Sequence, residues 1–337
     1  MRRVWPLLVL VELLGWQPSP ASAQTKLHVK EKSVEFEGRG GGAFSPDATV
    51  YVPSPFGSKL RVYDAATGKE IASRMTPLPR EAGTPYPTVC AFSPDGTLFA
   101  FTIRGGVSLW ETKKWKQVAV LRMPDTRALA FSPDSRSLAV QHSFPPDPNH
   151  PPAVSIWDLK GDKGVYERAS LQGGHSAPVY SPDGKLLFIG DTFWITETED
   201  SWKFLGGKVL PEGVNKLSHV SFSPDSKLFF AFAYSSGEFG ERKVEGFIRD
   251  VKTGKGVLVT EVGPGERWKS VFSPDGKVLA VQGPGIELIA VETGKKLATI
   301  KGAFFPVVFS EDGKTLTSRG NSTIKTWELT WEKEPGK

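Results

Sequence analysis

A short phrase occurs seven times along the chain, and its spacing constrains the fold more than any other feature. Each copy has an aromatic residue, then Ser, then Pro or Glu, then Asp; the aspartates are Asp47, Asp95, Asp134, Asp183, Asp225, Asp275 and Asp312. Successive aspartates lie 37–50 residues apart. A period of roughly 40–45 residues is typical of propeller arrays with four strands per blade. We therefore expect an all-β fold, a seven-bladed β-propeller with four antiparallel strands in each blade.

The phrase itself predicts a tight hairpin. Ser-Pro-Asp-Gly suits a type I turn, because Pro presets φ at the second position, Asp tolerates the third and Gly relaxes the fourth. Three copies replace the Gly with Ala48, Ser135 and Ser226, which a type I turn accepts. Apolar-rich segments such as 98–101 and 278–281 follow the turns. Seven equivalent aspartates at such positions indicate structural turn residues rather than acids or bases.

A second repeated feature follows the hairpins. Four segments end in an aromatic residue and an acid: Tyr63-Asp64, Trp110-Glu111, Trp157-Asp158 and Trp327-Glu328. The equivalent position holds Arg249-Asp250 and Ile289-Ala290 in two other repeats, and turns with Thr-Gly-Lys follow this position at 67–69, 253–255 and 293–295. Together with the first phrase, this pattern resembles the WD40-repeat β-propellers of bacterial style, over about residues 26–330. TolB-type and lactonase-like propellers use similar turns. The resemblance implies that the connections between second and third strands emerge at the same end as the loops between blades.

The two ends of the repeat array complement each other. The last third-strand pattern, at 323–328, is not followed by a fourth strand, whereas residues 32–37 precede the first hairpin and read as a fourth strand. We therefore predict that the N-terminal strand completes blade seven, which protects sheet edges that would otherwise invite aggregation.

The N-terminus has the features of a secretory signal peptide over residues 1–23. Arg2 and Arg3 precede a short apolar stretch, and Ala21-Ser22-Ala23 suits cleavage. The stretch is short for a membrane span of about 20 residues, although an uncleaved anchor stays open. We expect an exported protein, periplasmic or extracellular, without a transmembrane helix after cleavage. Residues 24–330 would form the propeller, and residues 331–337 a short polar tail.

Charge and residue chemistry argue against several classes of function. The net charge of +5 falls to +4 after cleavage, and the cations are scattered among acids. This pattern does not favour nucleic acid, although weak attraction to anionic envelope surfaces is consistent with it. Cys90 is the single cysteine, so no internal disulfide forms, and a buried role is expected. The five histidines lack metal-site spacing, and no Gly-x-Ser-x-Gly elbow occurs, so we predict no metal and no cofactor.

Loop lengths provide the remaining functional signal. The second-to-third-strand connection is tight at 104–106 but long at 143–152 and 234–243. Long loops on one face of a scaffold commonly carry binding. The candidate contact residues are Arg104, Phe144, His150, Phe239 and Arg242. We expect a monomeric, non-catalytic interaction or scaffolding module that binds an unknown protein or peptide. A lactonase-like hydrolase with a metal at the central channel is the alternative, and a support within a larger envelope assembly is a third reading.

Overall fold

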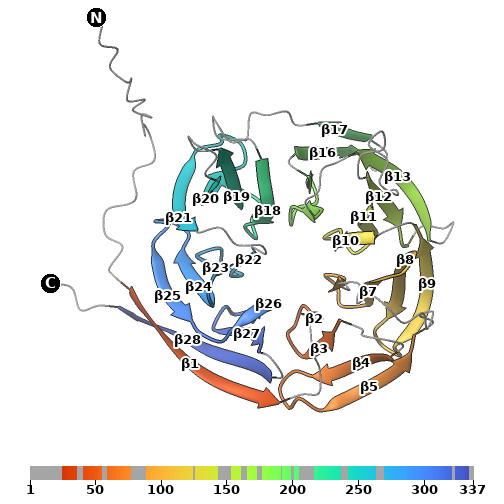
Figure 1. Cartoon of the computed structure of the whole chain (residues 1–337), viewed down its shortest axis with the longest axis horizontal. Helices are drawn as coiled ribbons and strands as arrows, with labels where there is room; N and C mark the ends of the chain where they lie inside the picture. The colour runs from red at the N-terminus through yellow and green to blue at the C-terminus, as the bar shows by residue number, and fades with distance from the viewer. Residues whose placement is uncertain are drawn as a thin grey trace, which may run out of the picture.

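Seven four-stranded antiparallel sheets form a ring in the computed structural model, which confirms the predicted fold (Figure 1). The structure describes residues 25–35, 41–54, 59–76, 89–123, 126–142, 153–160, 165–172, 177–190, 192–198, 201–204, 216–236, 242–262, 269–320 and 323–333. All regular elements in these ranges are strands. The residues of the expected signal peptide lie outside them.

The first six blades each use four consecutive strands. Blade one has β2 (Gly42–Phe44), β3 (Val50–Pro53), β4 (Lys59–Asp64) and β5 (Glu70–Met75); blade two has β6 (Cys90–Phe92), β7 (Leu98–Ile103), β8 (Gly106–Glu111) and β9 (Lys116–Arg122). Blade three has β10 (Thr126–Phe131), β11 (Ser137–His142), β12 (Ala153–Asp158) and β13 (Tyr166–Gln172); blade four has β14 (Val179–Tyr180), β15 (Leu186–Ile189), β16 (Thr192–Thr198) and β17 (Ser201–Phe204). Blade five has β18 (Lys216–Phe222), β19 (Leu228–Ser236), β20 (Arg242–Asp250) and β21 (Gly256–Val262); blade six has β22 (Ser270–Phe272), β23 (Val278–Gln282), β24 (Ile286–Ala290) and β25 (Lys296–Ile300).

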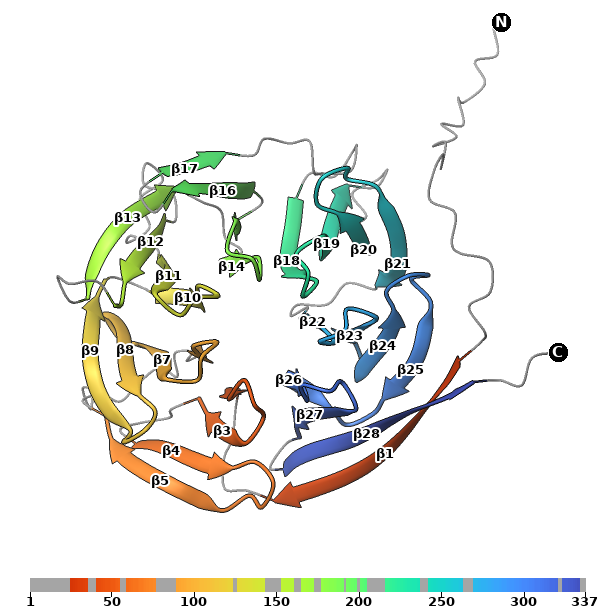
Figure 2. The ribbon, with the colours of Figure 1, turned by 180° about the vertical axis from the view of Figure 1, so that it is seen from behind.

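Blade seven joins the two ends of the chain. It contains β26 (Phe304–Phe309), β27 (Thr315–Arg319) and β28 (Thr323–Lys333), and its outer strand is β1 (Thr25–Glu35). β1 and β28 pair antiparallel without interruption from Thr25–Lys333 to Glu35–Thr323, and they lie side by side along the rim (Figure 2). An ion pair of 2.7 Å joins Glu31 and Lys325. The predicted closure is confirmed, with a strand that begins earlier than residues 32–37. Residues 331–333, predicted to belong to a polar tail, are part of β28 and pair with β1.

Apolar patterning separates the strands near the centre from those on the rim. In blade two, β7 reads Leu-Phe-Ala-Phe-Thr-Ile and is buried along its middle, while exposed and covered residues alternate in much of β9. A short continuous apolar run suits a strand covered on both faces, whereas alternation suits a half-covered one. The figures place β7 inside the ring and β9 at its outer edge.

Each pair of neighbouring blades shares its own apolar core. Leu60 and Val62 of blade one pack with Phe99 and Phe101 of blade two. Between blades five and six, Phe230 and Phe232 join a cluster that contains Leu279. A ring therefore stabilises a chain of this length without one large central core.

The six Ser-Pro-Asp turns and the Ser-Glu-Asp turn of blade seven share one hydrogen-bond pattern. In every copy the Ser Oγ donates to the Asp Oδ1 at 2.5–2.7 Å. The same Oγ accepts the backbone N–H five residues after the Ser at 2.9 Å. The Oδ1 also accepts the N–H two residues after the Asp, at 3.0–3.1 Å. The hydrogen bond from the Ser223 hydroxyl lowers the pKa of Asp225. These carboxylates therefore stabilise their own turns, and Asp95 in addition forms an ion pair of 2.8 Å with Lys160 of blade three.

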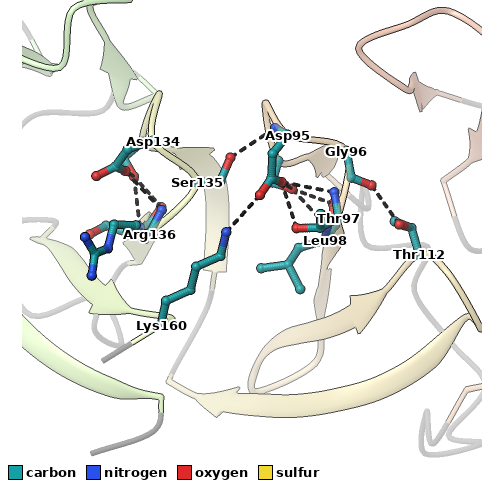
Figure 3. A network of polar contacts seen from close by, with 12 residues as sticks. Asp95, Gly96, Thr97, Leu98, Thr112, Asp134, Ser135, Arg136 and Lys160 are labelled. Atoms are coloured by element: carbon teal, nitrogen blue, oxygen red, sulfur yellow. Dashed lines mark hydrogen bonds and ion pairs between the residues drawn. The ribbon is translucent and has the colours of Figure 1, made fainter. Parts of the chain in front are cut away.

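The residue after each Asp adopts a left-handed conformation, which the sequence pattern did not reveal. Its φ is 69–71° at the four glycines and 58–59° at Ala48, Ser135 and Ser226. This conformation is costly for residues with a Cβ. Two of the three exceptions bond to the preceding blade: Ser135 Oγ accepts the Asp95 N–H at 3.0 Å (Figure 3), and Ser226 Oγ accepts the Asp183 N–H at 2.9 Å. These serines therefore link neighbouring blades through their turns.

Substitution of these residues by Gly should distinguish the cost of the left-handed backbone from the stabilisation by the inter-blade hydrogen bonds. We expect Ala48→Gly to raise the free energy of unfolding by about 0.5–1 kcal/mol, because relief of the left-handed strain exceeds the entropy cost of Gly. Ser226→Gly also loses a hydrogen bond worth about 1 kcal/mol and should change stability little. Urea denaturation of both variants measures the difference. Equal gains would mean that the Ser226 bond contributes nothing.

Candidate functional site

The hairpin topology gives the ring two unlike ends. The Ser-Pro-Asp turns join the first and second strands of every blade, and we call their end the turn face. Because the strands are antiparallel, the second strands lead to the opposite end, where the second-to-third-strand connections also begin. We call this end the loop face.

The five predicted contact residues fall unevenly on the described chain. Arg104 is exposed in the tight connection between β7 and β8. Arg242 begins β20 and pairs with Ser236 of β19. Phe144, His150 and Phe239 lie outside the described residues. The structure thus places Arg104 in a second-to-third-strand connection and the backbone of Arg242 in the strand that follows one, and a role in binding stays a prediction for all five.

Gly106, two residues after Arg104, lies where the backbone leaves no room for a side chain. Gly106 has a φ of 150°, and a Cβ there would lie 1.8 Å from the Leu121 carbonyl oxygen. Only Gly fits such a close backbone approach. Gly at this position therefore lets β8 approach β9 closely. In blade five the connection is shorter than the predicted 234–243, because β19 extends to Ser236 and β20 begins at Arg242.

The strands nearest the centre contain no carboxylate. The first and second strands of all seven blades lack Asp and Glu throughout their described ranges. They do carry cations, among them Arg127 and Arg319. Arg127 is exposed and is the extra residue of a bulge between Thr126 and Ala128. The inner part of the ring therefore differs in charge from the turn face, where the seven aspartates lie.

A histidine–serine cluster joins the inner strands of blades five and six. His219 is the extra residue of a bulge in β18 and has a φ of 46°. Its Nε2 accepts the Ser270 backbone N–H at 2.8 Å and lies 3.1 Å from the Ser270 Oγ. The Ser270 and Ser221 hydroxyls are 2.6 Å apart. A Ser hydroxyl beside a His nitrogen has the elements of an activated nucleophile.

The bonding of His219 nevertheless suits a structural role. Because the Ser270 N–H donates to Nε2, the proton of the neutral ring must sit on Nδ1. Burial, with the nearby Lys269 ammonium, lowers the pKa of His219 to about 4. A neutral ring whose Nε2 already accepts a backbone bond is poorly placed to take a proton from Ser270. The cluster holds blades five and six together, and no spacing in the sequence predicts it.

The single cysteine also lies at an inner strand. Cys90 is half-buried at the start of β6, with its Sγ 3.8 Å from the Ser54 Oγ. Burial raises the pKa of this thiol to about 12, against smaller opposing effects of the Ser54 hydrogen bond and of Lys269. A neutral thiol is a weak nucleophile. Lys269 precedes blade six and influences both Cys90 of blade two and His219 of blade five, so these inner positions converge around the centre.

Two further kinds of feature are absent from the described residues. No group of three or more His, Cys, Asp or Glu side chains in them is placed to hold a metal ion. The same ranges contain no helix of the length and apolarity that a membrane crossing requires.

The chain was also compared with known proteins. It matches no protein-family model and no curated protein. The assignment to the seven-bladed β-propeller fold therefore depends on the strand topology itself.

Proposed function

We propose that this chain is a non-catalytic, exported interaction or scaffolding module of the WD40-like type. It binds a protein or peptide through its loop face. A closed ring presents that face on a rigid support, and preorganisation of a binding surface lowers the cost of association. The propeller topology and the closure of blade seven are consistent with this role.

One observation carries the proposal: in the described part of the chain, the turn aspartates, His219 and Cys90 are held in structural contacts or are poor nucleophiles. The seven turn aspartates accept hydrogen bonds from their own turns. His219 accepts a backbone bond through Nε2, and the Cys90 thiol is neutral near pH 7. Among the residues described, these contacts favour binding over chemistry.

The alternative is a lactonase-like hydrolase that holds a metal at the central channel. Oxygen-rich metal sites use carboxylates, and the fourteen first and second strands contain none in their described ranges. Calorimetric titration of the protein with Ca²⁺ and Zn²⁺ tests this alternative. Stoichiometric binding that a variant of His219 abolishes would favour the hydrolase.

Affinity capture from an envelope extract tests the binding proposal. The bait is the wild-type protein beside a variant in which Arg104 is replaced by Ala and residues 144–152 by a short Gly-Ser turn. The matched control carries Lys227→Gln, Lys277→Gln and Lys314→Gln on the turn face, where these exposed lysines lie 3.3–3.8 Å from their turn aspartates. We expect a partner that the loop-face variant loses and the control retains. Equal capture by all three proteins would overturn the proposal.

A further inference from the structure

The outer strands of blades one and two expose aliphatic side chains. Of the six large apolar side chains exposed within the described ranges, four lie on β5 and β9: Ile71 (55%), Met75 (68%), Val118 (50%) and Val120 (38%). Figures 1 and 2 both show these two strands following one another along the rim. Single exposed apolar residues are ordinary on protein surfaces, but a group on adjoining strands requires an explanation.

The blade architecture does not by itself require this exposure. Ile71 and Val118 are each the extra residue of a bulge where the outer strand pairs with the third strand. The equivalent bulge residues in blades three, five and six are Arg168, Val259 and Leu297. All three are half-buried. The exposed aliphatic side chain at this position is therefore a property of blades one and two rather than of the repeat.

Exposed cations flank these aliphatic side chains along the two strands and in the turn before β9. Residues 69–76 and 113–122 contain one carboxylate, Glu70, and six exposed cations: Lys69, Arg74, Lys113, Lys114, Lys116 and Arg122. Glu70 itself lies 3.8 Å from Arg61. The Arg74 guanidinium donates to the Lys114 carbonyl oxygen at 3.2 Å, so the end of β5 meets the turn before β9. We call the four aliphatic residues and the six cations the rim patch.

Protection of an exposed strand edge explains the cations of the rim patch but not its aliphatic residues. Lysines on an exposed edge strand discourage pairing with other chains. Exposed Ile, Val and Met oppose that effect, because they favour association. Their combination with a strong excess of positive charge matches the requirements of a lipid interface. There, apolar side chains enter the boundary between headgroups and acyl chains, and cations stay at the phosphates.

We propose that the rim patch docks the propeller onto an anionic phospholipid surface. Docking through the rim leaves both the loop face and the turn face accessible to other molecules. The proposal does not depend on the partner at the loop face, because it uses different residues.

Vesicle sedimentation with the full mature protein tests the proposal. The probes are vesicles of phosphatidylglycerol with phosphatidylcholine, and vesicles of phosphatidylcholine alone. We expect binding to the anionic vesicles only, with loss at about 0.5 M salt through screening. The variant Lys113→Gln, Lys114→Gln, Lys116→Gln should lower the partition coefficient by about 100-fold at low salt. The variant Ile71→Thr, Met75→Gln, Val118→Thr should lower it at least about 10-fold.

The control variant must remove three positive charges from a surface outside the rim patch. Lys227→Gln, Lys277→Gln, Lys314→Gln changes the net charge equally on the turn face and should bind vesicles like the wild type. Circular dichroism melting confirms that every variant is folded. Equal loss in this control would show a non-specific effect of net charge and overturn the proposal. Binding that needs the cations but not the aliphatic residues, and that a polyglutamate peptide displaces, would identify a polyanion site and overturn it as well.

Discussion

Deletion of residues 25–36 is expected to leave the chain insoluble or to remove of the order of 5 kcal/mol from its free energy of unfolding, a large part of the stability of a typical domain. The deletion removes β1, which pairs with β28 along eleven residues and contributes Val29 to the apolar cluster of blades six and seven. β28 would become an exposed edge strand, with free backbone groups able to pair with other chains. Thermal melting and size-exclusion chromatography provide the measurement.

The control for this deletion is the chain that begins at residue 24. It keeps β1 complete and should melt in one cooperative transition as a monomer. A synthetic peptide of residues 25–36, added in trans to the shortened chain, should restore part of the lost stability if pairing with β28 is the cause. A shortened chain that melts like the control would contradict the role of β1 in closing the ring.

Acidification between about pH 6.5 and pH 4 is expected to destabilise the protein through His219. Burial lowers the folded-state pKa of this histidine to about 4, below an unfolded value near 6.5. The unfolded chain therefore binds the proton first. Stability is fully present above pH 6.5, falls as the pH decreases toward 4, and then levels off, with a total loss of up to about 3 kcal/mol. Urea denaturation at a series of pH values measures this slope.

His219→Gln isolates this effect, because the amide oxygen can accept the Ser270 N–H but does not titrate. The variant should show a shallower slope between pH 6.5 and 4. Burial also lowers the pKa of His142, so His142 accounts for part of the remaining slope. The turn aspartates with a lowered pKa, such as Asp225, lose their contribution as the pH falls below about 3.8, outside this window. An unchanged slope in His219→Gln would contradict the assignment.

The sequence was sufficient to predict the seven-bladed propeller because the same hairpin motif occurs seven times. Each Ser-Pro-Asp turn is local, so its residues predict a hairpin without knowledge of distant contacts. The period then gives the number of blades, and the missing fourth strand at 323–328 indicates the closure with β1. The full extent of β1 was not predictable, because its pairing partners lie about 300 residues away in the sequence.

The site features were far less accessible to sequence reasoning. His219 becomes notable only through a bulge and a bond to a strand 51 residues later. Ser135 and Ser226 look like ordinary substitutes for Gly until their bonds to the preceding blade are seen. Ile71 and Val118 are exposed because neighbouring blades do not cover the bulge at which each lies. The residue type alone does not predict this exposure. Three of the five predicted contact residues lie outside the described ranges.

The pairing of β1 with β28 also affects how the protein can be made. Ribosomes synthesise β1 first and β28 last among the strands, so the first strand has no partner during nearly the whole of translation. A nascent chain that ends before residue 323 can assemble six complete sheets, yet it lacks the strand that pairs with β1. The edge of β1 is therefore covered only once the chain has been made through β28.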